Sequence, residues 1–201
     1  MSMTAALISC SLKPSSEESS TDTMLDLFAE ELKDHGVATT SIRVADHDVA
    51  PGVAHDMGDG DQWPTIRDRI MDAQVLVLGA PIWLCHPSSI AQRVLERLDA
   101  YISETDDRAQ MPPVDKVAVL AVVGNEDGAH HVGAELYQGL ADIGFTIPAN
   151  GMAYWVGEAM HGTDYNDLEE SPEGTASTTR TAAANAAHLS GLLRGSGYPA
   201  G

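Results

Sequence analysis

The chain alternates between short apolar runs and longer segments in which apolar residues recur at helical spacing. The apolar runs predict strands at residues 5–9, 39–44, 74–79 and 116–123, with a fifth strand starting at 145–147. The intervening segments predict helices at 22–35, 63–72, 88–103 and 130–143, followed by an alanine-rich closing helix at 173–194. The third and fourth runs are apolar throughout, as is typical of strands buried on both faces of a parallel sheet. The pattern therefore predicts a doubly wound α/β fold with five parallel strands in the order 2-1-3-4-5.

The length of 201 residues suits one domain with a substantial core. We expect a single domain over residues 1–195 and a flexible tail over residues 196–201. Residues 46–62 are rich in Asp, Gly and Pro, which predicts a long exposed loop.

The net charge of −19, from 30 acidic and 11 basic residues, excludes two classes of partner. A field of this sign repels nucleic acid and anionic membrane surfaces, so we expect neither to bind. The apolar run after Met3 is too short to span a membrane and follows no basic segment, so we expect a cytoplasmic protein. Cys10 and Cys85 are the two cysteines, and we expect free thiols, with a redox pair as the alternative.

In a sheet of this order, ligands bind beyond the carboxyl ends of the strands. The loop after the first predicted strand, residues 10–21, is rich in hydroxyl groups and leads into a helix N-terminus. Backbone N–H groups and the helix dipole favour a phosphate monoester there, although an ordinary well-capped turn remains the alternative. The chain has neither the GxxxxGK[ST] nor the GxGxxG pattern, which argues against those two nucleotide-binding loops.

The loop after the third predicted strand, residues 80–89, is apolar where a surface loop is usually polar. Trp83 lies between Pro81 and Pro87 and offers a flat wall to a planar ring. Packing of Trp83 and Leu84 against a helix is an equally good interpretation at this stage.

The loop after the fourth predicted strand contains Gly124 and Gly128, which allow the backbone to approach a ligand closely. Asn125 and the loop amides can donate to ring oxygens and nitrogens. A hydroxyl-lined phosphate site, an aromatic wall and a glycine-rich edge together suit the parts of a flavin mononucleotide, FMN.

The adjacent histidines His130 and His131 suggest a metal site at first sight. Neighbouring side chains at a helix start point in different directions, and no third ligand stands at useful spacing in the sequence. We therefore expect no metal, and we treat His86 and His131 as surface histidines rather than as proton donors to a substrate.

Three segments resemble a known family: Ser11-Leu12-Lys13 through Ser19-Ser20-Thr21, then Gly79-Ala80-Pro81-Ile82-Trp83, then Val123-Gly124-Asn125 with Gly128. Over about residues 4–150 the chain resembles the NADPH-dependent FMN reductase and flavodoxin-like NAD(P)H:quinone oxidoreductase superfamily. The resemblance implies a flavodoxin-like three-layer sandwich with FMN at the three loops. The cofactor-binding positions that it implies are Ser11, Lys13, Ser19, Ser20, Thr21, Pro81, Ile82, Trp83, Leu84, Gly124, Asn125 and Gly128.

The resemblance also implies an oxidoreductase that uses NADPH or NADH and passes electrons through FMN to a quinone, a flavin or a similar acceptor. No catalytic acid or base is required, and the acidic pair Glu126-Asp127 would make a nearby flavin harder to reduce. A flavodoxin-type electron carrier and a flavin-free binding domain are the alternatives.

Relatives of this kind are homodimers or homotetramers, so a homo-oligomer is expected. Residues 151–171 are predicted to be irregular and to cover the pocket or an interface. The segment contains Tyr154, Trp155 and Met160.

Overall fold

The computed structural model describes residues 3–158 and 161–200 and has one sheet at its centre. The strands are β1 (Met3–Ser9), β2 (Val37–Arg43), β3 (Val75–Trp83), β4 (His86–Pro87), β5 (Val117–Gly124) and β6 (Met152–Val156). Parallel strands follow the order β2-β1-β3-β5-β6, and β4 pairs antiparallel with the end of β3. Since β4 is a short addition outside this path, the order is the predicted 2-1-3-4-5.

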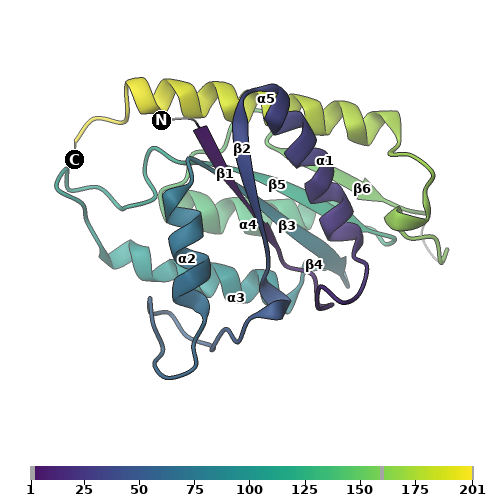
Figure 1. Ribbon diagram of the computed structural model, residues 1–201, viewed down its shortest axis with the longest axis horizontal. Helices are drawn as coiled ribbons and strands as arrows, with labels where there is room; N and C mark the ends of the chain where they lie inside the picture. The colour runs from purple at the N-terminus through teal and green to yellow at the C-terminus, as the bar shows by residue number, and fades with distance from the viewer. Residues whose placement is uncertain (1–2, 159–160, 201) are drawn as a thin grey trace.

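Helices cover both faces of the sheet (Figure 1). They are α1 (Ser20–Asp34), α2 (Trp63–Asp72), α3 (Ser89–Leu98), α4 (Ala129–Asp142) and α5 (Glu173–Gly195). Helices α1 and α5 pack on one face, and α2, α3 and α4 pack on the other. Leu7 and Ile8 are neighbours in β1 but belong to core clusters on opposite faces, as expected for a strand buried on both sides. The predicted three-layer sandwich is confirmed. None of the described helices is both long and apolar enough to cross a lipid bilayer.

The fifth parallel strand starts later than the sequence predicted. Thr146 makes an isolated parallel bridge to Val117, but the continuous strand β6 begins only at Met152. Pro148 has no backbone N–H, and Asn150 adopts a left-handed conformation with φ of 52°, so the ladder is interrupted between these points. The expectation of an irregular segment from 151 is therefore wrong for β6, and Met160 lies outside the described residues.

Strand β3 also runs further than predicted. It continues through Pro81 and Ile82 to Trp83, and Pro81 is in register with Val123 of β5. Leu84 and Cys85, with φ of 51° and 66°, then form the tight turn that leads into β4. Residues 80–83, which we predicted to be a loop, are thus the end of a central strand.

Ile102 is half exposed, although the sequence predicted it to belong to the buried stripe of a helix over 88–103. Helix α3 ends at Leu98, and residues Asp99–Ser103 form a 3₁₀ helix. The change from 3.6 to three residues per turn rotates Ile102 away from the core.

The long loop over residues 46–62 is fastened to helix α3 by a buried ion pair. The Arg97 guanidinium lies 2.7 Å from the Asp61 carboxylate, and both side chains are almost completely buried. Arg97 also donates to the carbonyl oxygens of Ala50 and Ala54 at 2.8 and 2.9 Å. The loop is exposed over much of its length, as predicted, but it is tied down at its base.

The carboxyl group of Asp61 is held in its ionised form. Burial alone would raise the pKa of Asp61, but the hydrogen bonds from Arg97 and from three backbone N–H groups outweigh it. The result is a pKa well below the usual range of an aspartate.

The residues after α5 contact the body of the protein. The Tyr198 N–H donates to Asp115 at 2.8 Å, and the Tyr198 hydroxyl lies 3.1 Å from that of Thr146. Gln110 also donates to the carbonyl oxygen of Pro199. The expectation of a flexible tail did not include these contacts.

Candidate functional site

A pocket of about 130 Å³ opens at the carboxyl ends of β1, β3 and β5, where the sequence predicted a ligand. Its lining residues are Ser11, Leu12, Lys13, Ser19, Ser20, Thr21, Pro81, Ile82, Trp83, Val123, Gly124, Asn125, Trp155, Asp164 and Tyr165. The structure therefore brings ten of the twelve candidate residues to one pocket. Leu84 and Gly128 are the two that do not line it.

One end of the pocket is formed by the N-terminus of α1. Ser19 is the N-cap residue, but its side chain makes no capping hydrogen bond, although the residue is buried. Ser20 and Thr21 follow in the first turn and line the pocket beside it. A serine hydroxyl without its usual capping bond, at the positive end of a helix dipole, suits an anionic ligand.

The loop between β1 and α1 is held in place by Arg43 at the end of β2. The Arg43 guanidinium donates to the Glu17 carbonyl oxygen at 2.7 Å and also to that of Pro14. Its Nε donates to the Asp22 carboxylate at 2.8 Å, and Asp22 also accepts a hydrogen bond from Ser9. Arg43 thus fixes the loop and pairs with the acidic group in the first turn of α1, a role that the sequence analysis did not identify.

Aromatic side chains form the other part of the pocket. Trp83 is 54% exposed, so it does not pack under a helix. Trp155 lies in β6 across the pocket, and its ring centroid is 5.5 Å from that of Tyr165. Exposed and half-exposed aromatic faces around one pocket are suited to a planar ligand.

Trp155 and its neighbour Tyr154 point to opposite faces of β6. Tyr154 stacks edge-on against His130, with centroids 5.0 Å apart, and takes no part in the pocket. Asp164 and Tyr165 complete the lining from the segment after β6, and Asn125 donates to Asp164 at 2.9 Å. The sequence analysis predicted that residues 151–171 cover the pocket or an interface, but it did not single out Asp164 and Tyr165 as lining residues.

The two glycines of the third loop make room for protein atoms. A Cβ on Gly124 would lie 2.9 Å from Ile82, and one on Gly128 would lie 2.6 Å from the Cα of Cys85. Gly128 also has φ of 117°, which favours glycine. These glycines allow β5 and α4 to pack closely on the end of β3. For Gly128 this differs from the close approach to a ligand that the sequence suggested, whereas Gly124 also lines the pocket.

Residues Glu126 and Gly128 both contact the β3–β4 turn. Glu126 accepts a hydrogen bond from the Leu84 N–H at 2.8 Å, and Gly128 packs on Cys85. Leu84 and Cys85 are side-chain-bearing residues in the left-handed region, a conformation that costs about 1–2 kcal/mol for each. The contacts with Glu126 and Gly128 offset part of that cost.

The two cysteines are free thiols in different surroundings. Cys10 is buried, and burial raises the pKa of its thiol far above the usual range. Cys85 is exposed at the turn between β3 and β4.

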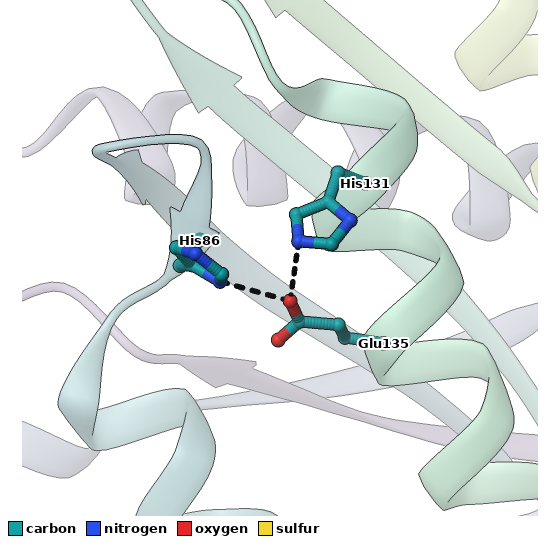
Figure 2. A group of neighbouring side chains, drawn as sticks. All are labelled: His86, His131 and Glu135. Atoms are coloured by element: carbon teal, nitrogen blue, oxygen red, sulfur yellow. Dashed lines mark hydrogen bonds and ion pairs between the residues drawn. The ribbon is translucent and has the colours of Figure 1, made fainter.

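The histidines are arranged differently from the sequence prediction. His130 and His131 do point in different directions, since His130 contacts Tyr154. However, His131 lies beside both His86 and Glu135 (Figure 2). The premise that no third ligand is close is therefore wrong, because β4 brings His86 across to α4.

A model of the NADPH-dependent FMN reductase family matches residues 3–161. The chain belongs to this family. The resemblance that the three loop segments indicated is thereby confirmed, and it places the chain among flavin-binding oxidoreductases.

Two curated relatives of this FMN reductase family member match nearly its whole length. One is the 8-demethyl-8-aminoriboflavin-5'-phosphate synthase of Streptomyces davaonensis, which is 32% identical over 98% of this chain and 81% of the relative. The other is the divalent metal cation transporter MntH of Mycobacterium bovis, which is 36% identical over 94% of this chain. The chain spans only 29% of that transporter's length.

Solved structures agree with this family assignment. RosB, in a crystal structure with bound 8-demethyl-8-formylriboflavin-5'-phosphate, has a TM-score of 0.88 and 32% identity, over 98% of this chain and 82% of RosB. The NADH:FMN oxidoreductase EMOB has a TM-score of 0.66 at 15% identity, over 94% of this chain and 89% of its own. An archaeal flavodoxin has a TM-score of 0.60 at 10% identity, over 94% and 99%. These last two share the flavodoxin-like fold.

Proposed function

We propose that this protein is an FMN-dependent oxidoreductase that takes a hydride from NADPH or NADH and passes electrons to a quinone, a flavin or a similar small acceptor. The observation that carries the proposal is the pocket itself. It combines a hydroxyl-lined helix N-terminus with exposed aromatic faces at the carboxyl edge of the sheet.

The residues of this pocket suit both the phosphate and the ring of FMN. Ser11, Ser19, Ser20 and Thr21 would hold the phosphate through hydroxyl groups and the first N–H groups of α1, with Lys13 beside them. The net charge of −19 repels a phosphate at long range, so this local arrangement has to supply the attraction.

The ring of the flavin would lie between aromatic side chains and the ends of two strands. Trp83 and Trp155 would pack against it, with Pro81 and Ile82 at the end of β3 and Gly124 and Asn125 at the end of β5. When bound, FMN supplies the capacity to accept and donate a hydride. The protein residues bind and orient the ring and limit the access of water, and none is required as an acid or base.

The direct test is to add NADPH or NADH to the FMN-loaded protein without oxygen. We expect rapid loss of the visible flavin absorbance, and its return when a quinone is added. A flavin that stays oxidised with both nucleotides would indicate the electron-carrier alternative. A protein that takes up no FMN would indicate the flavin-free one.

Replacement of Arg43 is expected to weaken FMN binding without removing any residue of the pocket. The Arg43→Lys variant keeps the charge but loses the planar group that contacts Glu17 and Asp22 together. We expect FMN affinity to fall by about 10-fold, consistent with a loss of about 1.4 kcal/mol. Limited proteolysis should cut residues 14–18 faster in the variant.

Arg180→Ala is the control for that experiment, because Arg180 pairs with Glu173 on the exposed surface of α5. Its FMN affinity should equal that of the wild type. Equal FMN affinity in the Arg43 variant would contradict the assigned role of Arg43.

A second candidate function treats the flavin as the substrate. The similarity to RosB, which was crystallised with a modified riboflavin phosphate, is much greater than to EMOB or the archaeal flavodoxin. In this case, FMN incubated with the protein, small-molecule amine donors and dioxygen as the oxidant would change in mass. Mass spectrometry of the released flavin separates the two functions, since an electron-transfer enzyme returns FMN unaltered.

We also propose that the protein acts in the cytoplasm as a homodimer or homotetramer, without nucleic acid or membrane partners. The pocket volume of about 130 Å³ is below the roughly 300 Å³ of a typical ligand site, and the exposed Trp83 lies in its lining. A second subunit covering this edge would enclose the ligand further. Sedimentation analysis of the FMN-loaded protein tests the oligomeric state.

A further inference from the structure

Helix α4 and strand β4 bring two imidazoles and one carboxylate together on the surface beside the pocket (Figure 2). His86 Nδ1 lies 2.9 Å from Glu135 Oε1, and His131 Nε2 lies 2.7 Å from the same oxygen. The three ligand atoms all lie within 4.8 Å of one another. In the described part of the chain, no other three His, Cys, Asp or Glu side chains are grouped in this way.

We propose that His86, His131 and Glu135 form a binding site for a divalent transition-metal ion of the Zn²⁺ type, which fastens the β3–β4 turn to helix α4.

The donor atoms suit such an ion. Tetrahedral Zn²⁺ with bonds of about 2.0–2.1 Å places its ligand atoms about 3.3 Å apart. The contacts of His131 and His86 with Glu135, at 2.7 and 2.9 Å, are somewhat shorter than this value, and all three ligand atoms lie within 4.8 Å of one another, so their spacing is of the size that such an ion requires. Imidazole nitrogens favour Zn²⁺ and its neighbours in the first transition row over Mg²⁺ or Ca²⁺, which prefer oxygen ligands.

The position of the cluster leaves room for ligands other than the protein. The side chains of His86 and His131 are 62% and 53% exposed, and that of Glu135 is 35% exposed. Three protein ligands with open positions on the solvent side correspond to the arrangement that holds a reactive or exchangeable metal.

The electrostatic surroundings attract a cation. His131 and Glu135 also line a surface groove between α3 and α4, and Glu96, Asp99 and Asp142 lie in that same groove. With a net charge of −19 on the whole chain, the local field favours a divalent cation over an anion.

The backbone conformation of the β3–β4 turn explains why a link between this turn and α4 would matter. His86 is the cross-strand partner of Trp83, and the turn between them consists of Leu84 and Cys85 in the left-handed conformation. This conformation is unfavourable for residues with a Cβ, so a link to α4 would add to the contacts that Glu126 and Gly128 already make with the turn. A metal ion bound to His86 from β4 and to His131 and Glu135 from α4 would link the turn to a helix that is packed on the core.

The test is calorimetric titration of protein that carries no histidine tag with ZnCl₂ in a buffer that does not chelate metals. We expect one Zn²⁺ per chain, and a loss of affinity of more than about 10-fold in His86→Ala and in Glu135→Gln. His130→Ala is the matched control, because His130 is adjacent in sequence but faces Tyr154, and its Zn²⁺ affinity should be unchanged.

Further readouts make the result specific to this site. Co²⁺ should give visible absorption bands in the wild type and in His130→Ala but not in His86→Ala, and Mg²⁺ should not compete with Zn²⁺. Amide hydrogen exchange of residues 83–86 should slow when Zn²⁺ binds. Circular dichroism of the variants shows that each is folded.

Three results would overturn the proposal. The wild type could fail to bind Zn²⁺, or His86→Ala could bind it as tightly as the wild type does. Zn²⁺ binding without slower exchange at residues 83–86 would show that the ion does not fasten the β3–β4 turn to α4. None of these measurements depends on FMN, so they are independent of the proposed oxidoreductase function.

Discussion

Replacing Arg97 with methionine is expected to lower the free energy of unfolding by about 3–5 kcal/mol. The substitution leaves the buried Asp61 carboxylate without its partner and removes the donors to the carbonyl oxygens of Ala50 and Ala54. An ionised carboxylate that is buried without a partner carries a large desolvation cost. Chemical denaturation followed by circular dichroism measures the change.

Two controls show whether the effect comes from the broken pair. The double variant Arg97→Met with Asp61→Leu removes both charges and should recover part of the lost stability, since the three backbone N–H groups that donate to Asp61 lose their acceptor. Arg180→Ala breaks the exposed pair with Glu173 and should change the free energy of unfolding by less than about 1 kcal/mol. A single Arg97 variant as stable as the wild type would show that the pair contributes no net stability.

The same pair predicts a pH dependence. Because the pKa of Asp61 is lower in the folded protein than in the unfolded chain, its contribution to stability is fully present above the unfolded pKa of about 4. It is lost as the pH falls below that value towards the folded pKa. The stability difference between the wild type and the double variant should therefore shift in favour of the variant between about pH 5 and pH 2.

Replacing Trp83 with alanine is expected to weaken FMN binding by about 10- to 100-fold, or about 1.4–3 kcal/mol. Trp83 presents an exposed aromatic face to the pocket, and its removal deletes a large contact surface without disturbing the core. Titration of the apoprotein with FMN, followed by quenching of the flavin fluorescence, measures the affinity.

Leu84→Ala provides the matched comparison for Trp83→Ala. Leu84 is the next residue, is 84% exposed and does not line the pocket. Its replacement should leave FMN affinity unchanged. If the two variants bind FMN equally well, Trp83 is not part of the ring site.

The sequence predicted most of the fold because the buried strands are strongly apolar. Val75–Leu78 and Val117–Val123 are buried on both faces, so a continuous apolar run identifies them without any tertiary information. The end of β1 was located for the same reason. The start of α1 was predicted from helical spacing at residue 22, two residues after its actual start at Ser20.

The details that the sequence did not reveal depend on contacts between distant segments. The turn at Leu84 and Cys85 has neither Asn nor Gly, which favour such a turn, so nothing in the pattern predicts the β3–β4 hairpin. The approach of His86 to His131 and Glu135 follows from this hairpin. Asp164 and Tyr165 reach the pocket through the packing of a loop, for which periodicity carries no signal.

The contrast between the two cysteines makes the native chain ready for chemical labelling. Cys10 is buried and burial keeps its thiol protonated, whereas Cys85 is exposed at the tip of the β3–β4 turn. A maleimide dye or a spin label would therefore attach at one position without any engineered cysteine. That position is two residues from Trp83 and next to His86, so a single probe would report the arrival of a ligand at either location in real time.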